Sequence, residues 1–411
     1  MDNIQIHELP NGIRWVHRQV LHTKISHLGI MFDIGSRDEK DNQQGLAHFW
    51  EHLAFKGTQK RSNIQIINRL EVVGGELNAY TTKEKICFHA SILTDYYERA
   101  LDLLVDISFQ SVFPEKEINK ERNVILEEMA MYNDSPEDSI QDDFDEMIFD
   151  NHQLGKNILG NQESVKGFGK SDLEAFINEN IDTERIVFSS IGNFSHKQVA
   201  KLVNKYFEKI PSKRSKKVRT APTEYIAKSK IILKDNAQAH VTIGRPAFSL
   251  TDSKRLPFFM LTNLLGGAGM NSKLNLAIRE KNALVYSIDA GYTPYVDSGF
   301  FGIYFGTEQR QISKVKYLIY KELDKLKGVN LSSKQLQNTK DQLMGQMAIS
   351  EESNMSFMLM MAKSLLDLNK IESLEEIFIK INNVTSQVLR DLANEMYQEK
   401  DFSTLEYHQI K

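Results

Sequence analysis

The segment His48-Phe49-Trp50-Glu51-His52 carries the clearest chemistry in the chain. On a helix, His48 and His52 lie one turn apart on the same face, so both imidazoles can bind one metal ion. Glu51 lies close to that face, where a carboxylate can act as a general base. Two unrelated histidines on the surface of an amphipathic helix are the alternative interpretation of such a pentad.

A third metal ligand must come from elsewhere, because catalytic zinc usually takes three protein ligands and keeps one position for water. Residues 115–132 are predicted to form a helix on which Glu121 and Glu128, about two turns apart, share the inward face. Glu127 falls on a solvated side. A buried carboxylate is costly unless it is paired, hydrogen-bonded or bound to metal. A pair satisfied by arginine or histidine is the alternative, but beside the pentad the pattern favours a metal site.

Such a site predicts hydrolysis of a peptide bond. Zinc in it polarises a carbonyl group and lowers the pKa of water to about 7. A carboxylate in contact with that water can take its proton, and Glu51 has the right chemistry and position for this role.

Turn signals and apolar spacing predict the elements that position these residues. Two alternating runs flank Pro10-Asn11-Gly12 and predict a hairpin over residues 4–20. Further strands are predicted at 27–34, 77–81, 86–93 and 185–191, and helices at 46–55, 63–73, 96–109, 115–132 and 196–210.

The second half of the chain repeats features of the first. Residues 26–30 (SHLGI) are similar to 239–243 (AHVTI), and His27 corresponds to His240 (240 − 27 = 213). Residues 79–81 (AYT) match 291–293 (GYT) at nearly the same offset. We therefore expect an α+β fold with two homologous domains, each a mostly antiparallel sheet with helices packed on one face.

The predicted boundaries follow from a change in composition. The predicted parts are a zinc-binding domain at 1–210, a basic linker at 211–225 and a second domain at 226–411. The segment 211–220 is strongly basic, and a patch for nucleic acid or acidic lipid is the alternative to a solvated linker. The Met-rich stretch 344–361 is predicted to be helical core rather than a binding surface.

Composition excludes several classes of function. The 411 residues carry a net charge of −4, which gives no electrostatic case for binding nucleic acid. The single cysteine, Cys87, allows no internal disulfide and no cysteine-based zinc cluster. No apolar run is long enough for a membrane span, and no secretory signal is visible, so a cytoplasmic protein is expected.

Three stretches resemble signatures of the inverted-zinc metallopeptidase family, which includes insulin-degrading enzyme, pitrilysin and the mitochondrial processing peptidase. They are GLAHFWEHLAFKGT (45–58), GGELNAYTTKE (74–84) and ERNVILEEMAMYNDSPED (121–138). The resemblance covers essentially the whole chain and is greatest to half-size, bacterial-like members. It implies one zinc ion per chain, held by His48, His52 and Glu128, with Glu51 as the base. It also implies that Glu121 orients a ligand without binding the metal.

The same resemblance implies two groups of substrate-binding residues. Asn78 and Ala79 would lie on an edge strand that pairs with the peptide backbone; from the residues alone, Asn78 is simply a polar residue in a strand flanked by glycines. The segment 264–287 resembles a second signature, in which Arg279 and Tyr286 hold the substrate and the tetrahedral intermediate. A surface arginine and a core tyrosine are the alternative.

The presence of both signatures in one half-size chain bears on assembly. The resemblance implies a homodimer in which Arg279 and Tyr286 of one subunit complete the zinc site of the other, around a closed clamshell chamber for unfolded peptides. The predicted function is that of a zinc-dependent endopeptidase. A non-catalytic scaffold or regulatory subunit of the same fold is the alternative.

Overall fold

The computed structural model describes residues 4–410 and divides into two compact units, each of which is described by itself. Unit 1 contains the chain up to Ala130 together with Lys156–Arg219 and Ser350–Ile371. Unit 2 contains Met131–Gly155, Thr220–Ile349 and the chain from Glu372 onward.

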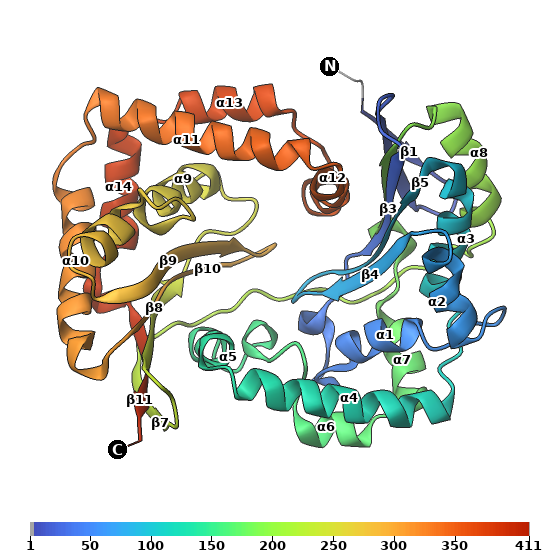
Figure 1. Ribbon diagram of the computed structural model, residues 1–411, viewed down its shortest axis with the longest axis horizontal. Helices are drawn as coiled ribbons and strands as arrows, with labels where there is room; N and C mark the ends of the chain where they lie inside the picture. The colour runs from blue at the N-terminus through green and yellow to red at the C-terminus, as the bar shows by residue number, and fades with distance from the viewer. Residues whose placement is uncertain (1–3, 411) are drawn as a thin grey trace. The chain divides into compact units, whose positions relative to one another are not determined.

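Unit 1 is built on a six-stranded sheet in the order β1-β2-β6-β3-β5-β4. Its strands are β1 (Gln5–Glu8), β2 (Arg14–Gln19), β3 (Ile25–Phe32), β4 (Glu76–Thr81), β5 (Ile86–Leu93) and β6 (Ile186–Gly192). β2 and β6 are parallel, and every other neighbouring pair is antiparallel. This order leaves β4 at one edge of the sheet (Figure 1). The predicted hairpin is confirmed, and Gly12 in its turn has a φ of 90°, which glycine adopts without strain.

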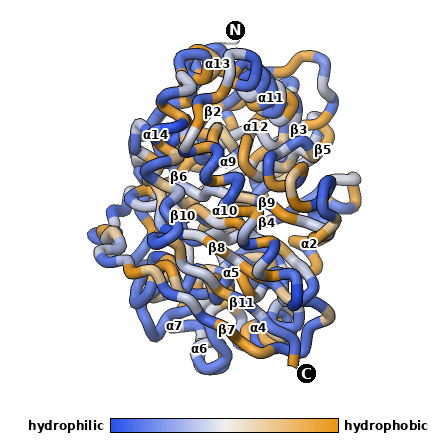
Figure 2. The backbone as a smooth tube through the Cα atoms, turned by 90° about the vertical axis from the view of Figure 1, so that its left-hand side faces the viewer, coloured by the Kyte–Doolittle hydropathy of each residue, from blue (hydrophilic) through white to orange (hydrophobic). Residues whose placement is uncertain are grey.

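The helices of unit 1 form the main layer on one face of this sheet. They are α1 (Leu46–Ala54), α2 (Asn63–Glu71), α3 (Tyr97–Phe109), most of α4 (Glu115–Asn133), α6 (Gln162–Gly167), α7 (Lys170–Asn180) and α8 (His196–Phe207). Their apolar sides share a core with inward residues of the strands such as Leu28, Ile30 and Phe88. Hydrophobic and hydrophilic residues alternate along the backbone in Figure 2, as elements with one buried side require.

The opposite face of the sheet in unit 1 is covered by α12 (Asn354–Leu368). Met358 and Met361 are fully buried there against strand residues that include Met31 and Cys87. A Cβ atom on Gly29 of β3 would lie 2.9 Å from the sulfur of Met358, so glycine leaves room for this helix. The expectation that the Met-rich stretch is helical core is confirmed for these residues.

Unit 2 repeats the same plan, with a sheet in the order β7-β11-β8-β10-β9. Its strands are β7 (Ser229–Lys234), β8 (Ala239–Pro246), β9 (Val285–Pro294), β10 (Gly299–Thr307) and β11 (Ser403–Gln409). Its helices are α5 (Pro136–Ile148), α9 (Arg255–Gly266), α10 (Ile312–Gly328), most of α11 (Ser333–Glu352), α13 (Leu374–Asn382) and α14 (Ser386–Met396), with a π-helical segment η6 (Asn275–Glu280). Among the described strand pairs of this sheet, β7 and β11 are parallel and the others are antiparallel.

The two sheets confirm the predicted internal repeat. β3, β5 and β4 correspond to β8, β10 and β9, and the parallel pair of β2 and β6 corresponds to that of β7 and β11. The predicted α+β class with two homologous, mostly antiparallel sheets is therefore confirmed.

The compact units differ from the contiguous halves 1–210 and 226–411, and two helices account for most of the difference. α5 comes from the first half of the chain but packs on β8 and β11 of unit 2, and α12 comes from the second half but packs on β3 and β6 of unit 1. Each sheet has a second apolar face, and a helix from the other half covers it. The burial of apolar surface, and not position in the sequence, therefore decides which sheet α5 and α12 cover.

The basic segment at 211–225 forms no helix or strand, but it is not solvated throughout. The side chain of Arg219 is only 7% exposed and forms ion pairs with Asp33 at 2.8 Å and Asp38 at 2.6 Å. The prediction of a solvated linker is therefore wrong for its central part, because buried carboxylates of unit 1 need a cation. Separately, the helices found in residues 4–410 are all too short or too polar to cross a membrane.

Candidate metal centre

The N-terminus of α1, the helix that carries the pentad, is capped by the side chain of Glu39. A carboxylate oxygen of Glu39 accepts a hydrogen bond from the backbone N–H of Gly45 at 2.8 Å, and the other accepts from Ala47 at 2.7 Å. Burial raises the pKa of Glu39 to about 8, although these two hydrogen bonds act in the opposite direction. This cap satisfies N–H groups that α1 cannot pair within itself.

Amphipathic spacing orients the pentad within α1. Phe49, Trp50 and Leu53 lie in the core, where the ring of Trp50 packs 5.3 Å from that of Phe32. His48 and His52 lie on another side of the helix, with their ring centres 4.5 Å apart. The two histidines therefore share a face, as their spacing predicts.

Glu128 of α4 meets the two histidines. Its Oε2 lies 3.8 Å from Nε2 of His48 and 3.6 Å from Nε2 of His52, and the three residues offer ligand atoms within 4.8 Å of one another. Tetrahedral zinc with bonds of about 2.0–2.2 Å needs ligand atoms roughly 3.4 Å apart. The distances to Glu128 are close to that value, and two nitrogens and one carboxylate form a donor set typical of catalytic zinc. The residues present therefore fit a zinc ion.

Glu121 holds one of these histidines without joining the cluster. Its Oε2 lies 3.2 Å from Nδ1 of His52, and its Oε1 lies 2.7 Å from Nζ of Lys56. Burial alone would raise the pKa of Glu121, but its bonds to His52 and Lys56 outweigh burial and lower it. The ionised carboxylate accepts the Nδ1 proton of His52, which leaves Nε2 free to bind metal. Glu127 on the same helix is exposed, as predicted.

Burial, rather than a hydrogen bond to a carboxylate, keeps His48 in the neutral form that binds metal. It is only 7% exposed, and within residues 4–410 its Nδ1 is buried without a hydrogen-bond partner. Burial, together with neighbouring His52, lowers the pKa of His48 to about 3. The imidazole is therefore neutral at pH 7, which is the form that ligates metal.

Glu51 lies beside this cluster and is held by a residue that the sequence did not single out for this role. The hydroxyl of Thr81 on β4 donates a hydrogen bond of 2.5 Å to Oε2 of Glu51. Burial raises the pKa of Glu51 and Glu128 adds to the rise, while Thr81 and His52 oppose it. A carboxylate with a raised pKa is a better proton acceptor near neutral pH.

A pocket of about 220 Å³ connects this cluster to the edge of the sheet. Its lining residues come from α1, β4 and α4 and the turn after α1: Glu51, His52, Phe55, Lys56, Leu77, Asn78, Ala79 and Glu121. Asn78 is exposed and Ala79 half-buried on β4, whose outer edge has no neighbouring strand within the described residues. Asn78 and Ala79, which are predicted to pair with the substrate backbone, thus lie in this pocket, and their role stays a prediction.

Arg279 and Tyr286 come together in unit 2. Arg279 is on η6 and Tyr286 is at the start of β9, and the guanidinium carbon lies 5.9 Å from the centre of the tyrosine ring. Tyr286 is 84% exposed, which excludes the alternative of a core tyrosine. The pair is therefore available at the surface of unit 2, and its predicted role is not tested by this geometry.

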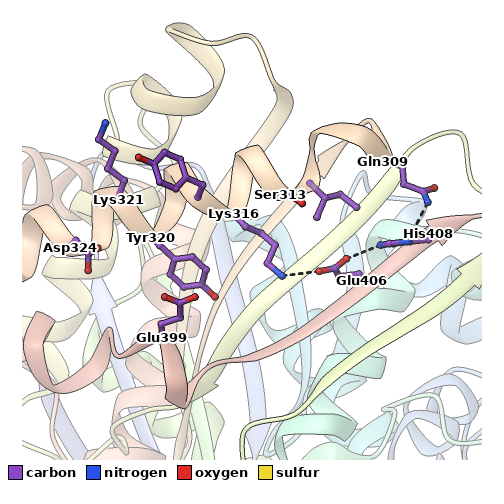
Figure 3. A pocket seen from close by; sticks show the side chains of 11 residues that line it. Gln309, Ser313, Lys316, Tyr320, Lys321, Asp324, Glu399, Glu406 and His408 are labelled. Carbon is purple, nitrogen blue, oxygen red and sulfur yellow. Dashed lines mark hydrogen bonds and ion pairs between the residues drawn. The ribbon is translucent and has the colours of Figure 1, made fainter.

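A larger pocket, of about 680 Å³, lies in unit 2 between α10 and β11 (Figure 3). Its charged floor is internally paired: Glu406 contacts Lys316 at 2.9 Å and His408 at 2.7 Å, and Gln309 lies 3.3 Å from His408. It contains none of the predicted site residues. The smaller pocket is therefore the candidate site, because His52 of the metal-ligand set and the predicted base Glu51 both line it.

The sequence is similar to that of a known peptidase family. Residues 16–162 match the family model described as Insulinase (Peptidase family M16), and residues 168–343 match the one described as Peptidase M16 inactive domain. A Bacillus subtilis protein named uncharacterized zinc protease YmxG is 33% identical over 389 residues, which span 95% of this chain and 94% of that protein.

The chain belongs to the M16 peptidase family. The resemblance seen in the sequence is thereby confirmed. A probable mitochondrial-processing peptidase subunit beta of Arabidopsis thaliana is 29% identical across 96% of this M16 chain and 76% of its own length.

Two solved structures share the fold of the whole chain. A structure titled as a peptidase M16 inactive domain from Pseudomonas fluorescens superposes with a TM-score of 0.92 at 17% identity, covering 100% of this chain and 99% of its own. A protease from Helicobacter pylori gives a TM-score of 0.90 at 20% identity, covering 99% of this chain and 100% of its own.

Proposed function

We propose that this M16 protein is a zinc-dependent endopeptidase. The observation that carries the proposal is the convergence of His48, His52 and Glu128, from α1 and α4, on one small region. Relatives of nearly the same length are named zinc proteases. Zinc bound in such a site polarises a peptide carbonyl and lowers the pKa of water.

In this proposal, different groups of the chain transfer the proton, orient a metal ligand and bind the substrate backbone. Glu51 accepts the proton of water and later returns it to the leaving amine. Glu121 keeps the Nδ1 proton on His52, so that Nε2 faces the metal. The free edge of β4 at Asn78 and Ala79 binds the substrate backbone, a mode that tolerates many side chains.

The proposal extends to the assembly. A homodimer would let Arg279 and Tyr286 of one protomer complete the site of its partner, where arginine binds a carbonyl and the tyrosine hydroxyl stabilises an oxyanion. The exposure of Tyr286 on unit 2 supports this assignment. The substrates would be unfolded peptides that enter a closed clamshell chamber.

The first experiment measures zinc content and cleavage of a quenched peptide by the purified protein, with and without a chelator. Glu51→Gln should keep stoichiometric zinc but lose turnover, whereas Glu128→Ala should lose the metal. Glu127→Gln, one position away but exposed, is the matched control and should behave as wild type. A wild-type protein that binds zinc but cleaves no peptide would instead support the scaffold or regulatory-subunit alternative.

A second experiment tests sharing of the site between protomers. Glu51→Gln subunits are mixed with Arg279→Ala subunits, each inactive alone. Mixed dimers then contain one site that combines an intact Glu51 with an intact Arg279, so partial recovery of activity is expected. Absence of recovery after verified subunit exchange would argue against the shared site.

A further inference from the structure

We infer that Thr81 is a positioning residue for Glu51, and that it ties the proton acceptor to the strand expected to hold the substrate. This inference rests on the proposed function. Its direct observation is the 2.5 Å hydrogen bond from the Thr81 hydroxyl to Oε2 of Glu51.

The alternation of β4 explains why Thr81 reaches α1. Leu77 and Ala79, four and two residues before Thr81, pack against the core on the helix side of the sheet. Tyr80 points to the opposite side and packs in the cluster beneath α12. Side chains alternate along a strand, so Thr81 shares the helix side, where α1 packs against β4.

The hydrogen bond leaves the carboxylate in one defined orientation. Within residues 4–410, the Thr81 hydroxyl is the only hydrogen-bond partner of the Glu51 carboxylate. One oxygen is held by the hydroxyl, and the other remains available to accept a proton. Without Thr81, a largely buried carboxylate would lack a donor and could rotate away from the reacting water, because a buried acceptor seeks another partner.

Thr81 also connects the base to the substrate. It lies on the same edge strand as Asn78 and Ala79, only two residues beyond Ala79. A peptide paired with this edge would therefore be fixed relative to Glu51 by the rigid strand, and small losses of alignment are costly to the chemical step.

The test compares Thr81→Val, which keeps the shape but removes the hydroxyl, with Thr81→Ser, which keeps the hydroxyl. With a quenched peptide, Thr81→Val should lower kcat about 10- to 100-fold, with KM within about twofold and zinc content unchanged. Thr81→Ser should restore most of kcat. Thr293→Val, the same substitution at an exposed threonine of β9 in unit 2, should match wild type.

A readout that needs neither zinc nor turnover separates this inference from the proposed function. In metal-free protein, Thr81→Val should lower the unfolding midpoint by about 2–4 °C in the wild-type background, but should have little effect when combined with Glu51→Ala. Such non-additivity supports the contact even if the protein cleaves no peptide. Wild-type kcat in Thr81→Val, equal impairment in Thr81→Ser, or additive midpoint shifts would each overturn the inference.

Discussion

Replacing Glu121 by glutamine tests how the protein prepares His52 for metal. The change keeps the size of the side chain but removes its charge. The side chain of Glu121 is 8% exposed, and its carboxylate lies 3.2 Å from Nδ1 of His52 and 2.7 Å from Nζ of Lys56. A glutamine can accept one hydrogen bond at its oxygen but presents an NH₂ group where the second oxygen was.

The expected loss follows from these contacts. A hydrogen bond to a charged group contributes about 1.5–3 kcal/mol, and every 1.4 kcal/mol corresponds to about a tenfold change in affinity. Glu121→Gln should therefore weaken zinc binding about 10- to 100-fold, the range typical for partners that orient metal ligands. Lys56→Met should act in the same direction but less strongly, because Glu121 remains to accept from His52.

The assay is competition for zinc against a fluorescent chelator at neutral pH. Glu127→Gln is the control, because it removes the same charge from an exposed position of α4. Its affinity should stay within about threefold of wild type, as expected for a screened surface charge. Equal zinc affinities for Glu121→Gln and Glu127→Gln would refute the orienting role of Glu121.

Three further predictions concern stability. Arg219→Met should destabilise unit 1 by about 3–5 kcal/mol in urea unfolding, because it leaves Asp33 and Asp38 buried without this cation. Met358→Ala should cost about 2–5 kcal/mol, because the fully buried side chain fills the interface between α12 and the sheet. Burial lowers the pKa of His17 from 6.5 to about 4, so between these pH values only the unfolded chain takes up the proton. Stability should therefore fall by up to about 3 kcal/mol as pH drops through this window, and His17→Gln should remove that part of the slope.

Exposed positions supply the controls for these measurements. Arg214→Met, whose side chain is 48% exposed, should cost less than about 1 kcal/mol, and Met131→Ala at a 63% exposed position should change little. A cost for Arg219→Met no larger than that of Arg214→Met would contradict the proposed role of the buried ion pairs. A pH slope identical in wild type and His17→Gln would contradict the assignment to His17.

Much of the fold could be predicted because its signals are local. The turn at Pro10-Asn11-Gly12 and the apolar spacing of α1 and α3 depend on residues that are close in sequence, and the observed bounds agree within a few residues. The internal repeat was visible for the same reason, because matching strands keep matching patterns. The sequence did not predict that α5 packs on the sheet of unit 2 and α12 on that of unit 1, since an apolar helix surface does not indicate which sheet it will cover.

In the candidate site, too, some features follow from local sequence spacing and others only from tertiary packing. The sequence by itself determined that His48 and His52 share a helix face, because four residues make about one turn, and that Glu121 turns inward on its helix. Only the tertiary structure decided that Glu128 meets those histidines, that Thr81 holds Glu51 and that Arg219 enters a cluster of buried acids. Partners 30 or more residues apart are brought together by packing and by the need to satisfy buried polar groups, and no local pattern contains that information.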